Sequence, residues 1–378
     1  MRKEGQPQGS WSSYHNSYSE QRSFDEVLAM ILLNNLPPLY NADSKRVKWI
    51  DAAKSLGIVL VFWGHILYGG SNIGGYINQL IYSFHMPMYF ILSGIVAKDE
   101  NLPFGQYVCN KFKRVLLPAL CFYLMTLPIY FLQVFNNRKT LDFESCVYDI
   151  FYIKGHCAYN DPIWFFICLF EVLCFGKLIH LTKLTKRSQM WVCVCSFTIA
   201  ILLSVLNLRY SALFGLNCAI LALGFYTFGI CLRRYQDMNP NYCEKKLSAY
   251  IIILIVLWLL VGLILNPKVS MYGFMYGNRL IPLFILSGIM GSIVFFRLAY
   301  KLRDLKILNF FAKYTTIIIC SHYLFVSSFN FLSTRFGLKG TIFFDILSLL
   351  YVIVVLWVLY RPLCVAIDKY LPFLNGKR

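Results

Sequence analysis

Charged residues are scarce in this sequence, and acidic ones are the scarcer kind. Of the 378 residues, 14% are charged and 58% are hydrophobic, and 18 acidic residues stand against 36 basic ones. A soluble globular domain carries roughly 25% charged residues. The composition therefore excludes an ordinary soluble enzyme and indicates a protein whose surface lies mostly in lipid.

Two kinds of motif are also missing. The 13 cysteines contain no C-x-x-C pair, so zinc-finger spacing is absent and no metal site is expected. Most of them fall within hydrophobic segments, where cysteine acts as a small apolar side chain. Cys146 and Cys157 share one loop, but nothing in the sequence requires a disulfide between them. The net charge of +18 comes without a nucleic-acid-binding motif, so we expect no nucleic-acid partner.

Long hydrophobic segments fill most of the chain. About ten of them are long and apolar enough to cross a bilayer, so we predict an all-α, polytopic membrane helix bundle. Its surroundings are then the lipid bilayer, and nothing in the sequence fixes an oligomeric state. The predicted spans are residues 50–69, 76–97, 115–135, 162–181, 190–206, 211–231, 247–265, 280–298, 315–332 and 342–361.

The positions of Lys and Arg indicate how the bundle is oriented. With the N-terminus in the cytoplasm, the inner loops hold 15 basic residues and the outer loops hold 8. Cytoplasmic loops of membrane proteins carry an excess of Lys and Arg, so we predict that both termini are cytoplasmic. We divide the chain into a mobile N-terminal tail (1–45), a transmembrane domain (46–365) and a short basic cytoplasmic tail (366–378). A short apolar stretch of the N-terminal tail is expected along the inner interface.

Three polar side chains stand in the first hydrophobic segment. Asp51 and Lys54 lie near its beginning, and His65 follows Lys54 by 11 residues. That interval is about three helical turns, so Lys54 and His65 point the same way, ~16 Å apart along the axis. Ionisable groups in such segments usually mark a functional path, although Lys54 is also close enough to the end to reach the headgroups. An imidazole titrates near neutrality, and we interpret His65 as the catalytic centre.

Two further motifs follow along the chain. The second segment contains His85 and Pro87, and the loop after it ends with Lys111 and Arg114. Proline in a membrane helix frees backbone carbonyls, which predicts a kink, and His85 is either a packed core histidine or a ligand contact. Lys111 and Arg114 share a face if their helix begins before the membrane. They either anchor the chain at the inner surface or bind the phosphates of a ligand.

Together these motifs resemble acyltransferase family 3, a group of membrane O-acyltransferases that includes bacterial sugar and polysaccharide O-acetylases and a fucose O-acetylase-like branch. The family opens with a pattern of the form R…D-x-x-[RK]-x10-H, and the matching residues are Arg46, Asp51, Lys54 and His65. A Phe-x-x-Pro…Ser-Gly segment follows, and the matching residues are Phe84, Pro87, Ser93 and Gly94. The family's R-x-x-R pair is present as Lys111-x-x-Arg114, in which lysine keeps the charge but loses the planar fork of arginine.

The resemblance implies an acyl-CoA-dependent O-acyltransferase, more narrowly an O-acetyltransferase, in the bacterial cytoplasmic membrane. Acetyl-CoA would be a co-substrate from the cytoplasm, and no permanently bound cofactor is implied. His65 would act as a general base or briefly take the acyl group itself, and Asp51 and Lys54, grouped with it as catalytic residues, would orient the entrance. The acceptor would be a hydroxyl of a sugar, on an exported or cell-surface glycan. The residues expected at the donor phosphates are Lys111, Arg114 and Arg46.

Five other polar or aromatic side chains are candidates for contacting the acceptor: His85, Asp161, Trp164, Glu171 and His322. Asp161 either contacts a sugar or caps the helix that follows it. Trp164 fits a position at the membrane interface better than a sugar-stacking platform. Glu171 is a costly carboxylate within a span, with structural and functional roles equally open. His85 and His322 either line the site or pack in the core.

A transporter or exporter of a glycan or small acid is the alternative function. Transporters often contain internal repeats with paired broken helices. Residues 281–288 (IPLFILSG) faintly echo residues 86–94 (MPMYFILSG), but no further repeat links the two halves of the chain. The sequence therefore favours an enzyme, and the intact His65 argues against a catalytically inactive relative.

Overall fold

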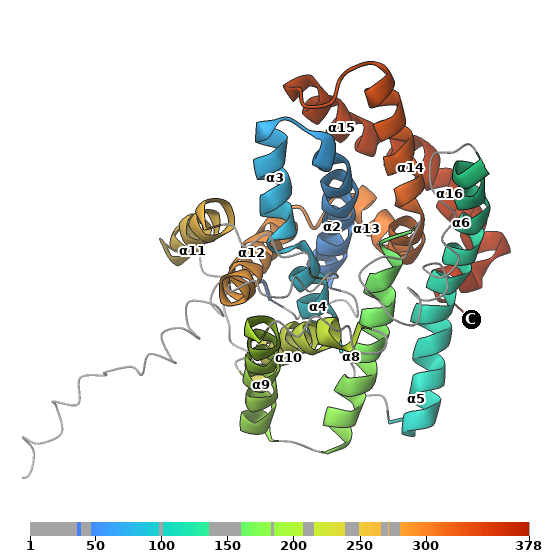
Figure 1. Cartoon of the computed structure of the whole chain (residues 1–378). Coiled ribbons are helices and arrows are strands. Elements are labelled where there is room, and N and C mark those ends of the chain that lie inside the picture. The colour runs from blue at the N-terminus through green and yellow to red at the C-terminus, as the bar shows by residue number, and fades with distance from the viewer. Residues whose placement is uncertain are drawn as a thin grey trace, which may run out of the picture.

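Helices form every regular element in the part of the chain that is described. The computed structural model describes residues 36–38, 47–97, 101–135, 160–182, 185–206, 215–238, 249–265, 271 and 280–377, and no strand occurs among them. The all-α prediction is confirmed for these residues, and Figure 1 shows their helices packed together. The α-helices are α2 Lys48–Ile66, α3 Asn72–Tyr82, α4 His85–Ile95, α5 Phe104–Lys111, α6 Leu117–Phe135, α8 Ile163–Leu181, α9 Lys186–Val205, α10 Leu216–Met238, α11 Ala249–Leu259, α12 Ile281–Lys301, α13 Lys306–Phe311, α14 Thr315–Arg335, α15 Ile342–Val354 and α16 Arg361–Tyr370. Tighter or wider turns extend several of them, chiefly η1 Leu67–Gly69, η2 Phe112–Leu116, η4 Leu260–Ile264 and η6 Val355–Tyr360.

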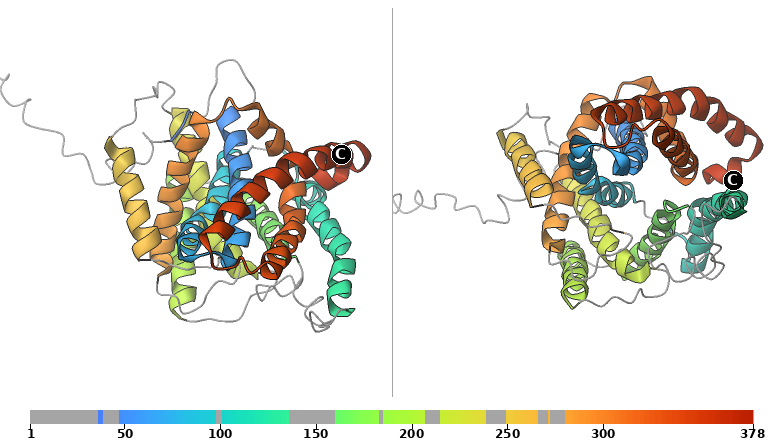
Figure 2. Two further views of the ribbon diagram at one scale, coloured as in Figure 1. Left: turned by 90° about the horizontal axis from the view of Figure 1, so that it is seen from above. Right: turned by 45° about the horizontal axis from the view of Figure 1, so that its top comes forward.

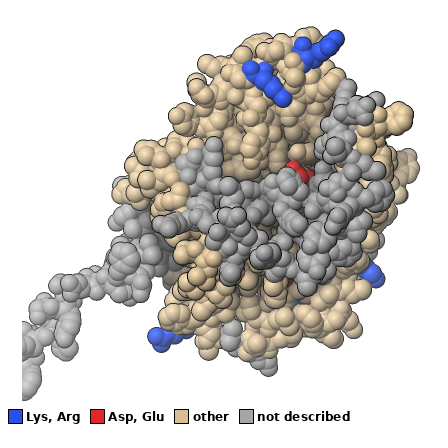
Figure 3. Space-filling view, viewed as in Figure 1, with Lys and Arg blue, Asp and Glu red and all other residues tan. Residues whose placement is uncertain are grey.

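Eight helices of the described chain are long and apolar enough to cross a membrane, by length and composition. They coincide with eight of the predicted segments. Figure 3 shows one face of the molecule, on which the described Lys and Arg side chains stand near the edges. Large apolar side chains are more than half exposed on several of these helices, among them Leu124, Trp191, Phe331 and Val358. Apolar surface on this scale fits contact with lipid.

The segment predicted as one span at 76–97 is instead two helices. α3 ends at Tyr82 and α4 begins at His85, with a turn between them. Pro87 accounts for the break, because it has no N–H for the carbonyl of Ser83 and its ring would clash with that carbonyl. Each helix has 11 residues, too few to cross a bilayer alone. The segment is therefore a pair of short helices joined by a turn, where a single kinked helix was predicted.

The described part of the segment predicted at 247–265 is a short helix. Its apolar part runs over Ile251–Ile264 and ends in the π turn η4, below the ~17 residues that a spanning helix needs. Both views of Figure 2 place α11 at one edge of the bundle and α6 at the opposite edge. Within the described chain, eight helices rather than ten meet the length requirement.

The helix that carries the first motif packs inside the bundle. α2 contacts α12, α13, α14 and α15, as well as α3 and α4. Its Trp49, Ile58 and Phe62 are buried, and Ala52 and Ala53 are buried with them. Small side chains let neighbouring membrane helices approach closely. The polar groups of α2 are therefore placed within protein rather than in lipid.

α4 and α10 cross with their backbones in contact. A Cβ atom at Gly94 would overlap the carbonyl oxygen of Tyr226, and one at Gly229 would overlap that of Ile91. Because both obstacles are backbone atoms, neither can move aside as a flexible side chain would. Glycine at these two positions is what permits this crossing, and the crossing holds α4 in place although it is too short to span.

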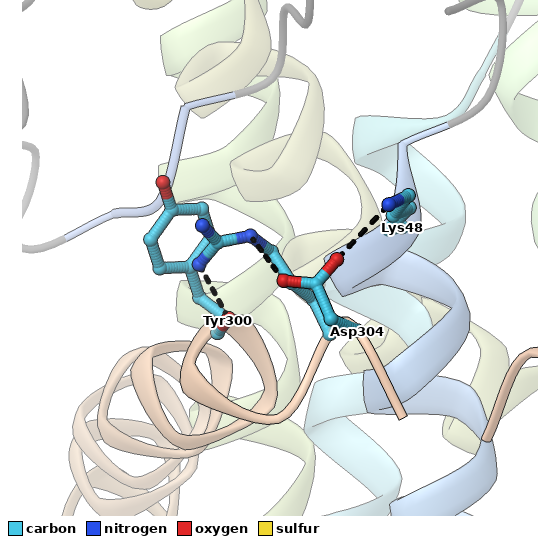
Figure 4. Close-up of polar contacts among 4 residues, drawn as sticks. Lys48, Tyr300 and Asp304 are labelled. Carbon is cyan, nitrogen blue, oxygen red and sulfur yellow. Dashed lines mark hydrogen bonds and ion pairs between the residues drawn. The ribbon is translucent and has the colours of Figure 1, made fainter. Parts of the chain in front are cut away.

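One end of α2 is joined to the turn after α12. Lys48 Nζ lies 2.9 Å from Asp304 Oδ1, and the Arg303 guanidinium lies 3.7 Å from the Tyr300 ring centroid. Figure 4 shows Lys48 facing Asp304 across this contact. The hydrogen bond from Lys48 holds the pKa of Asp304 below its usual value, but exposed ion pairs stabilise little. We call this end of the bundle the Lys48 face.

The chain just before α2 is packed against the bundle. Leu36 and Pro37 are buried. The Trp49 indole donates a hydrogen bond to the Pro38 carbonyl at 2.8 Å, and the Gln236 amide donates one to the Pro37 carbonyl at 3.1 Å. These residues are the described part of the predicted N-terminal tail. At this point the chain enters the core instead of lying along the interface.

At the opposite end, which we call the His65 face, α15 holds the start of α3. The Asp345 carboxylate is 6% exposed and accepts hydrogen bonds from the backbone N–H groups of Ser71 and Gly74, each at 3.1 Å. It also accepts one from the Ser71 hydroxyl at 2.5 Å. A carboxylate at a helix N-terminus satisfies N–H groups that have no partner within the helix and interacts favourably with the helix dipole. This contact fixes the connection between His65 and Tyr82.

Candidate active site

His65 lies in the last turn of α2 and faces a cavity of about 400 Å³. The cavity lies at the His65 face, and α2, α3, α4, α8 and α14 contribute to its wall. Aromatic side chains and a few polar groups line it, which is the usual composition of a small-molecule site. We call it the histidine cavity, and the lining residues discussed below are His65, Tyr68, Tyr82, His85, Tyr89, Asp161, Trp164, Tyr323 and Asn330.

A hydrogen bond connects the His65 ring to α3. The Tyr82 hydroxyl oxygen lies 3.3 Å from His65 Nδ1, and the two rings meet edge to face. If Nδ1 carries the ring proton and donates it to the tyrosine oxygen, Nε2 is left as an acceptor. In that form His65 can take a proton from a hydroxyl group.

Two more histidines stand beside this pair. The His322 ring centroid lies 5.3 Å from that of His65, and the His85 ring centroid lies 4.8 Å from that of Tyr82. In both His322 and His85, Nδ1 lies 2.8 Å from a backbone carbonyl. Nδ1 must be the protonated nitrogen there, so Nε2 is an acceptor in the neutral ring. Among the described residues, Nε2 of His322 is buried without a hydrogen-bond partner.

The start of α8 forms the opposite wall of the histidine cavity. Asn160 is 1% exposed and donates a hydrogen bond to the Cys320 carbonyl at 2.9 Å, which joins this turn to α14. Asp161 and Trp164 follow and line the cavity. Pro162 is the N-cap of α8, and no side chain caps the helix, so Asp161 does not have the capping role considered above. Trp164 is 7% exposed, so it lies inside the protein and not at the membrane interface as predicted.

Comparison with known proteins now identifies the family. A family model described as an acyltransferase domain matches residues 47–361. The chain belongs to acyltransferase family 3. No curated protein and no solved structure matches it. The resemblance drawn from the sequence motifs is confirmed, and the chain is a multi-pass membrane protein of an acyltransferase family.

Two residues of the family's opening motif lie away from the histidine cavity. α2 is continuous from Lys54 to His65, so the predicted separation of ~16 Å along the axis holds. Asp51 is 7% exposed, and the Lys54 carbonyl accepts a hydrogen bond from the Tyr89 hydroxyl at 3.0 Å. Tyr89 also lines the histidine cavity, so it links the two ends of the motif. Arg46 lies outside the described residues.

The predicted phosphate pair of the acyltransferase is interrupted by a π turn. The helix begins before the predicted span, as expected, but passes through η2 between Lys111 and Arg114. The wider π turn changes the angle between successive side chains, so the α-helical face assumed for the pair does not apply. Lys111 Nζ lies 4.8 Å from the Tyr107 ring centroid. Arg114 is exposed, and Gly376 lies against its carbonyl.

Glu171 lies midway along α8 and does not line the histidine cavity. Its Oε2 atom is buried without a hydrogen-bond partner among the described residues. The ten described cysteines are free, and no cluster of three or more possible metal ligands occurs in the described part of the chain. Cys146 and Cys157 lie outside the described residues.

The histidine cavity also contains side chains that the sequence reasoning missed. Tyr82 precedes His85 by about one helical turn, and Tyr323 directly follows His322. Asn330 comes about two turns after His322 on the same helix. The signal in the sequence that could have identified them was their position near His85 and His322, which were already candidates. Periodicity within one helix does not show which of its neighbours share a cavity.

Proposed function

We propose that the protein transfers an acetyl or other short acyl group from cytoplasmic acyl-CoA to a hydroxyl of a sugar, on an exported or cell-surface glycan. The observation that carries the proposal is the position of His65 in a cavity of about 400 Å³, with Nδ1 hydrogen-bonded to Tyr82. Membership of the acyltransferase family supports the reaction class. The donor and the acceptor are inferred from the motifs and from the lining of the cavity.

In the proposed reaction His65 acts as a general base. Nε2 of His65 accepts the hydroxyl proton of the acceptor, and the hydroxyl oxygen attacks the thioester carbonyl carbon. The carbon–sulfur bond breaks, an ester forms, and His65 returns the proton to the thiolate. The hydrogen bond from Nδ1 to Tyr82 orients the ring throughout. In the alternative, Nε2 first takes the acyl group from the thioester and the thiolate leaves. The acceptor hydroxyl then takes the acyl group from Nε2, and its proton goes to the thiolate.

The polar lining of the histidine cavity suits a sugar. The Asp161 carboxylate and the Asn330 amide can hydrogen-bond with hydroxyl groups, and Trp164 offers an apolar face to a sugar ring. His85 adds an acceptor nitrogen, whereas His322 is buried beside His65 and does not line the cavity. With both termini in the cytoplasm, this cavity lies toward the outer side, so the acceptor would arrive from the side opposite to the donor.

The broken helix does not favour transport. Transporters place paired discontinuous helices in corresponding positions of two repeats. Residues 86–94 belong to the short helix α4, but the echoing segment at 281–288 opens α12, which runs unbroken for 21 residues. The two similar segments therefore do not form a pair of broken helices.

The test is acyl transfer by purified full-length protein with radiolabelled acetyl-CoA and candidate glycans. We expect His65→Ala to lower the turnover by roughly 10²–10⁴-fold, since general base catalysis contributes about that much. His65→Gln should be as inactive, because an amide keeps hydrogen-bonding capacity but is no base. Thermal unfolding should show that both variants remain folded.

The outcomes separate the proposals. Near-normal turnover in folded His65→Ala would remove His65 from the chemistry. The absence of any acylated product from the wild type, together with His65-dependent substrate movement in liposomes, would instead establish the transporter. Radiolabel retained on wild-type protein without acceptor, and lost in His65→Gln, would support the covalent route.

A further inference from the structure

A second cavity lies at the Lys48 face, toward the far end of α8 from the histidine cavity. Its volume is about 210 Å³, and α4, α5, α8, α9 and α10 contribute to its wall. We call it the basic pocket, defined by the lining residues Tyr107, Lys177, His180, Gln189, Arg233 and Arg234. Arg233 and Arg234 belong to the loop charges that indicate topology in the sequence, and the fold gives them a shared concave surface.

Positive charge in the basic pocket exceeds the acidic charge that lines it. Asp237 lies 3.9 Å from Arg233 Nε, and Arg233 also donates a hydrogen bond to the Ala97 carbonyl. Among the described residues, no hydrogen bond or ion pair holds the Arg234 guanidinium. Lys177 adds a third cation to the lining and is 6% exposed. The surplus suits an anionic ligand, because Lys and Arg are the usual partners of phosphate.

An amide and two aromatic rings accompany these cations. Gln189 is 6% exposed and lines the pocket, and its Oε1 atom is buried without a hydrogen-bond partner among the described residues. Such an oxygen accepts a hydrogen bond from an amino group, as Gln does with adenine. Tyr107 and Tyr226 also line the pocket, and aromatic side chains stack on nucleobases. The cations match the phosphates of a nucleotide, and the unpartnered carbonyl oxygen and the aromatic rings match its base.

We propose that the basic pocket binds the nucleotide end of the acyl-CoA donor, with Lys177, Arg233 and Arg234 at its phosphates and Gln189 at the adenine amino group. This assignment rests on the proposed function, since it takes acyl-CoA to be the donor. It moves the main phosphate site from Lys111 and Arg114 to residues that the sequence motifs do not include.

The two cavities are placed for one extended ligand. Phe165 lines the histidine cavity and Lys177 lines the basic pocket. Lys177 follows Phe165 by 12 residues of α8, an interval of ~18 Å along the helix axis. α4 also contributes to both, with Tyr89 in the first and Gly94 in the second. The pantetheine arm is a linear chain between the nucleotide and the thioester. It would run beside α4 and α8 and bring the thioester to His65.

Lys111 lies beside the basic pocket. Its ammonium lies 4.8 Å from the Tyr107 ring centroid, and that of Lys177 lies 5.6 Å from the same ring. Lys111 is therefore a neighbour of the basic pocket and can add to its positive potential. Arg114 lies within the π turn η2 and is not among the pocket residues.

The test measures binding of acetyl-CoA, adenosine 3′,5′-bisphosphate and pantetheine to full-length protein in neutral-lipid nanodiscs. Arg234→Gln removes one charge without shortening the side chain much, and Gln189→Leu removes the amide. The matched control is Lys301→Gln, because Lys301 is an exposed cation at the end of α12 outside both cavities. Thermal unfolding checks that each variant is folded.

We expect Arg234→Gln to raise the Kd for acetyl-CoA and for the bisphosphate about tenfold or more, since a charge-assisted hydrogen bond is worth at least that factor. Gln189→Leu should weaken both ligands less strongly. Neither variant should change pantetheine binding, and Lys301→Gln should bind all three ligands as the wild type does. The salt dependence of bisphosphate binding should become shallower in Arg234→Gln, because one ionic contact is lost.

The results that would overturn the nucleotide assignment differ from those that would overturn the proposed function. If the wild type binds and transfers from acetyl-CoA but Arg234→Gln and Gln189→Leu match Lys301→Gln, the nucleotide assignment is overturned and the proposed function stands. If the wild type neither binds acetyl-CoA nor transfers from it, the proposed function fails as well. If the pocket variants alter only stabilisation by anionic-lipid nanodiscs, the basic pocket binds lipid headgroups and the assignment is overturned.

Discussion

The Tyr82 hydroxyl is the polar contact through which the His65 ring is oriented, at 3.3 Å from Nδ1. Removal of this hydroxyl should leave the cavity intact, but the His65 ring could then rotate and adopt either neutral tautomer. We expect Tyr82→Phe to lower kcat about tenfold, the effect of one hydrogen bond of about 1.4 kcal/mol. The KM for acetyl-CoA should stay unchanged, because the proposed phosphate site in the basic pocket is far from Tyr82. Steady-state kinetics with both substrates measure the two values separately.

Tyr76 supplies a control for this positioning role. It lies on the same helix, and its side chain is 59% exposed, so Tyr76→Phe removes a hydroxyl away from the site. We expect wild-type kinetics from that variant. A fall in kcat of equal size in both variants, or a loss in Tyr82→Phe that appears only in KM, would contradict the orienting role of Tyr82.

Single residues differ in how well the sequence predicted them. His65, His85, Asp161 and Trp164 were all singled out, and all four line one cavity. Their types are informative because ionisable and amphipathic groups within membrane spans are costly unless protein surrounds them. The surroundings of Trp164 were predicted wrongly, since sequence position near a span end does not show whether a neighbouring helix covers the side chain.

At the scale of elements, the crossing of α4 and α10 depends on glycine. A Cβ at Gly94 would meet the Tyr226 carbonyl oxygen, and backbone cannot yield without moving a helix. We expect Gly94→Ala to destabilise the protein by about 1–3 kcal/mol, the usual cost of overpacking. The midpoint of thermal unfolding in detergent should fall accordingly.

Gly75 is the matched control for the crossing. It lies within α3, and a Cβ there would have nothing within 4 Å. Alanine is the better helix former by roughly 1 kcal/mol, so Gly75→Ala should leave the unfolding midpoint unchanged or raise it. Equal midpoints for Gly94→Ala and the wild type would show that the two helices are not in backbone contact.

The Asp345 contact should likewise be measurable as stability. Its carboxylate accepts three hydrogen bonds at the start of α3, and hydrogen bonds to charged groups contribute about 1.5–3 kcal/mol each without being additive. We expect Asp345→Ala to lower the free energy of unfolding by about 2–4 kcal/mol. Asp345→Asn, which keeps an acceptor oxygen, should lose less. If Asp345→Ala unfolds like the wild type, α15 does not hold α3 in this way.

The Lys48–Asp304 pair should behave differently, because it is exposed. Lys48 lowers the pKa of Asp304, so any stabilisation is present above the usual Asp pKa of about 3.9 and is lost as the pH falls through the lowered value. Between pH 5 and 8, Asp304→Asn should therefore show a small, pH-independent effect. Unfolding midpoints measured across that range check this, and a strong pH dependence there would point to other groups.

At the scale of the whole molecule, the orientation in the membrane remains a prediction from the loop charges. The 15-to-8 division of basic residues predicts that both termini lie in the cytoplasm. Reporter fusions after Arg114 and after Asn160 should report the inside and the outside respectively, because α6 lies between them. Reporters on the same side would overturn the predicted spans. The reversed pattern would overturn the orientation and, with it, the assignment of the basic pocket to the cytoplasmic donor.

The sequence by itself determined the fold class and the family, and it singled out His65 as a candidate site residue. Hydropathy sets which segments can enter lipid, and a motif on one helix has a definite spacing. The placement of Trp164 inside the protein and the grouping of Lys177, Gln189 and Arg234 were decided only by the tertiary structure. Each depends on which helices pack together, through backbone contacts such as those at Gly94. Helical periodicity gives the direction of a side chain about its own axis, but it contains no information about the helix that stands opposite.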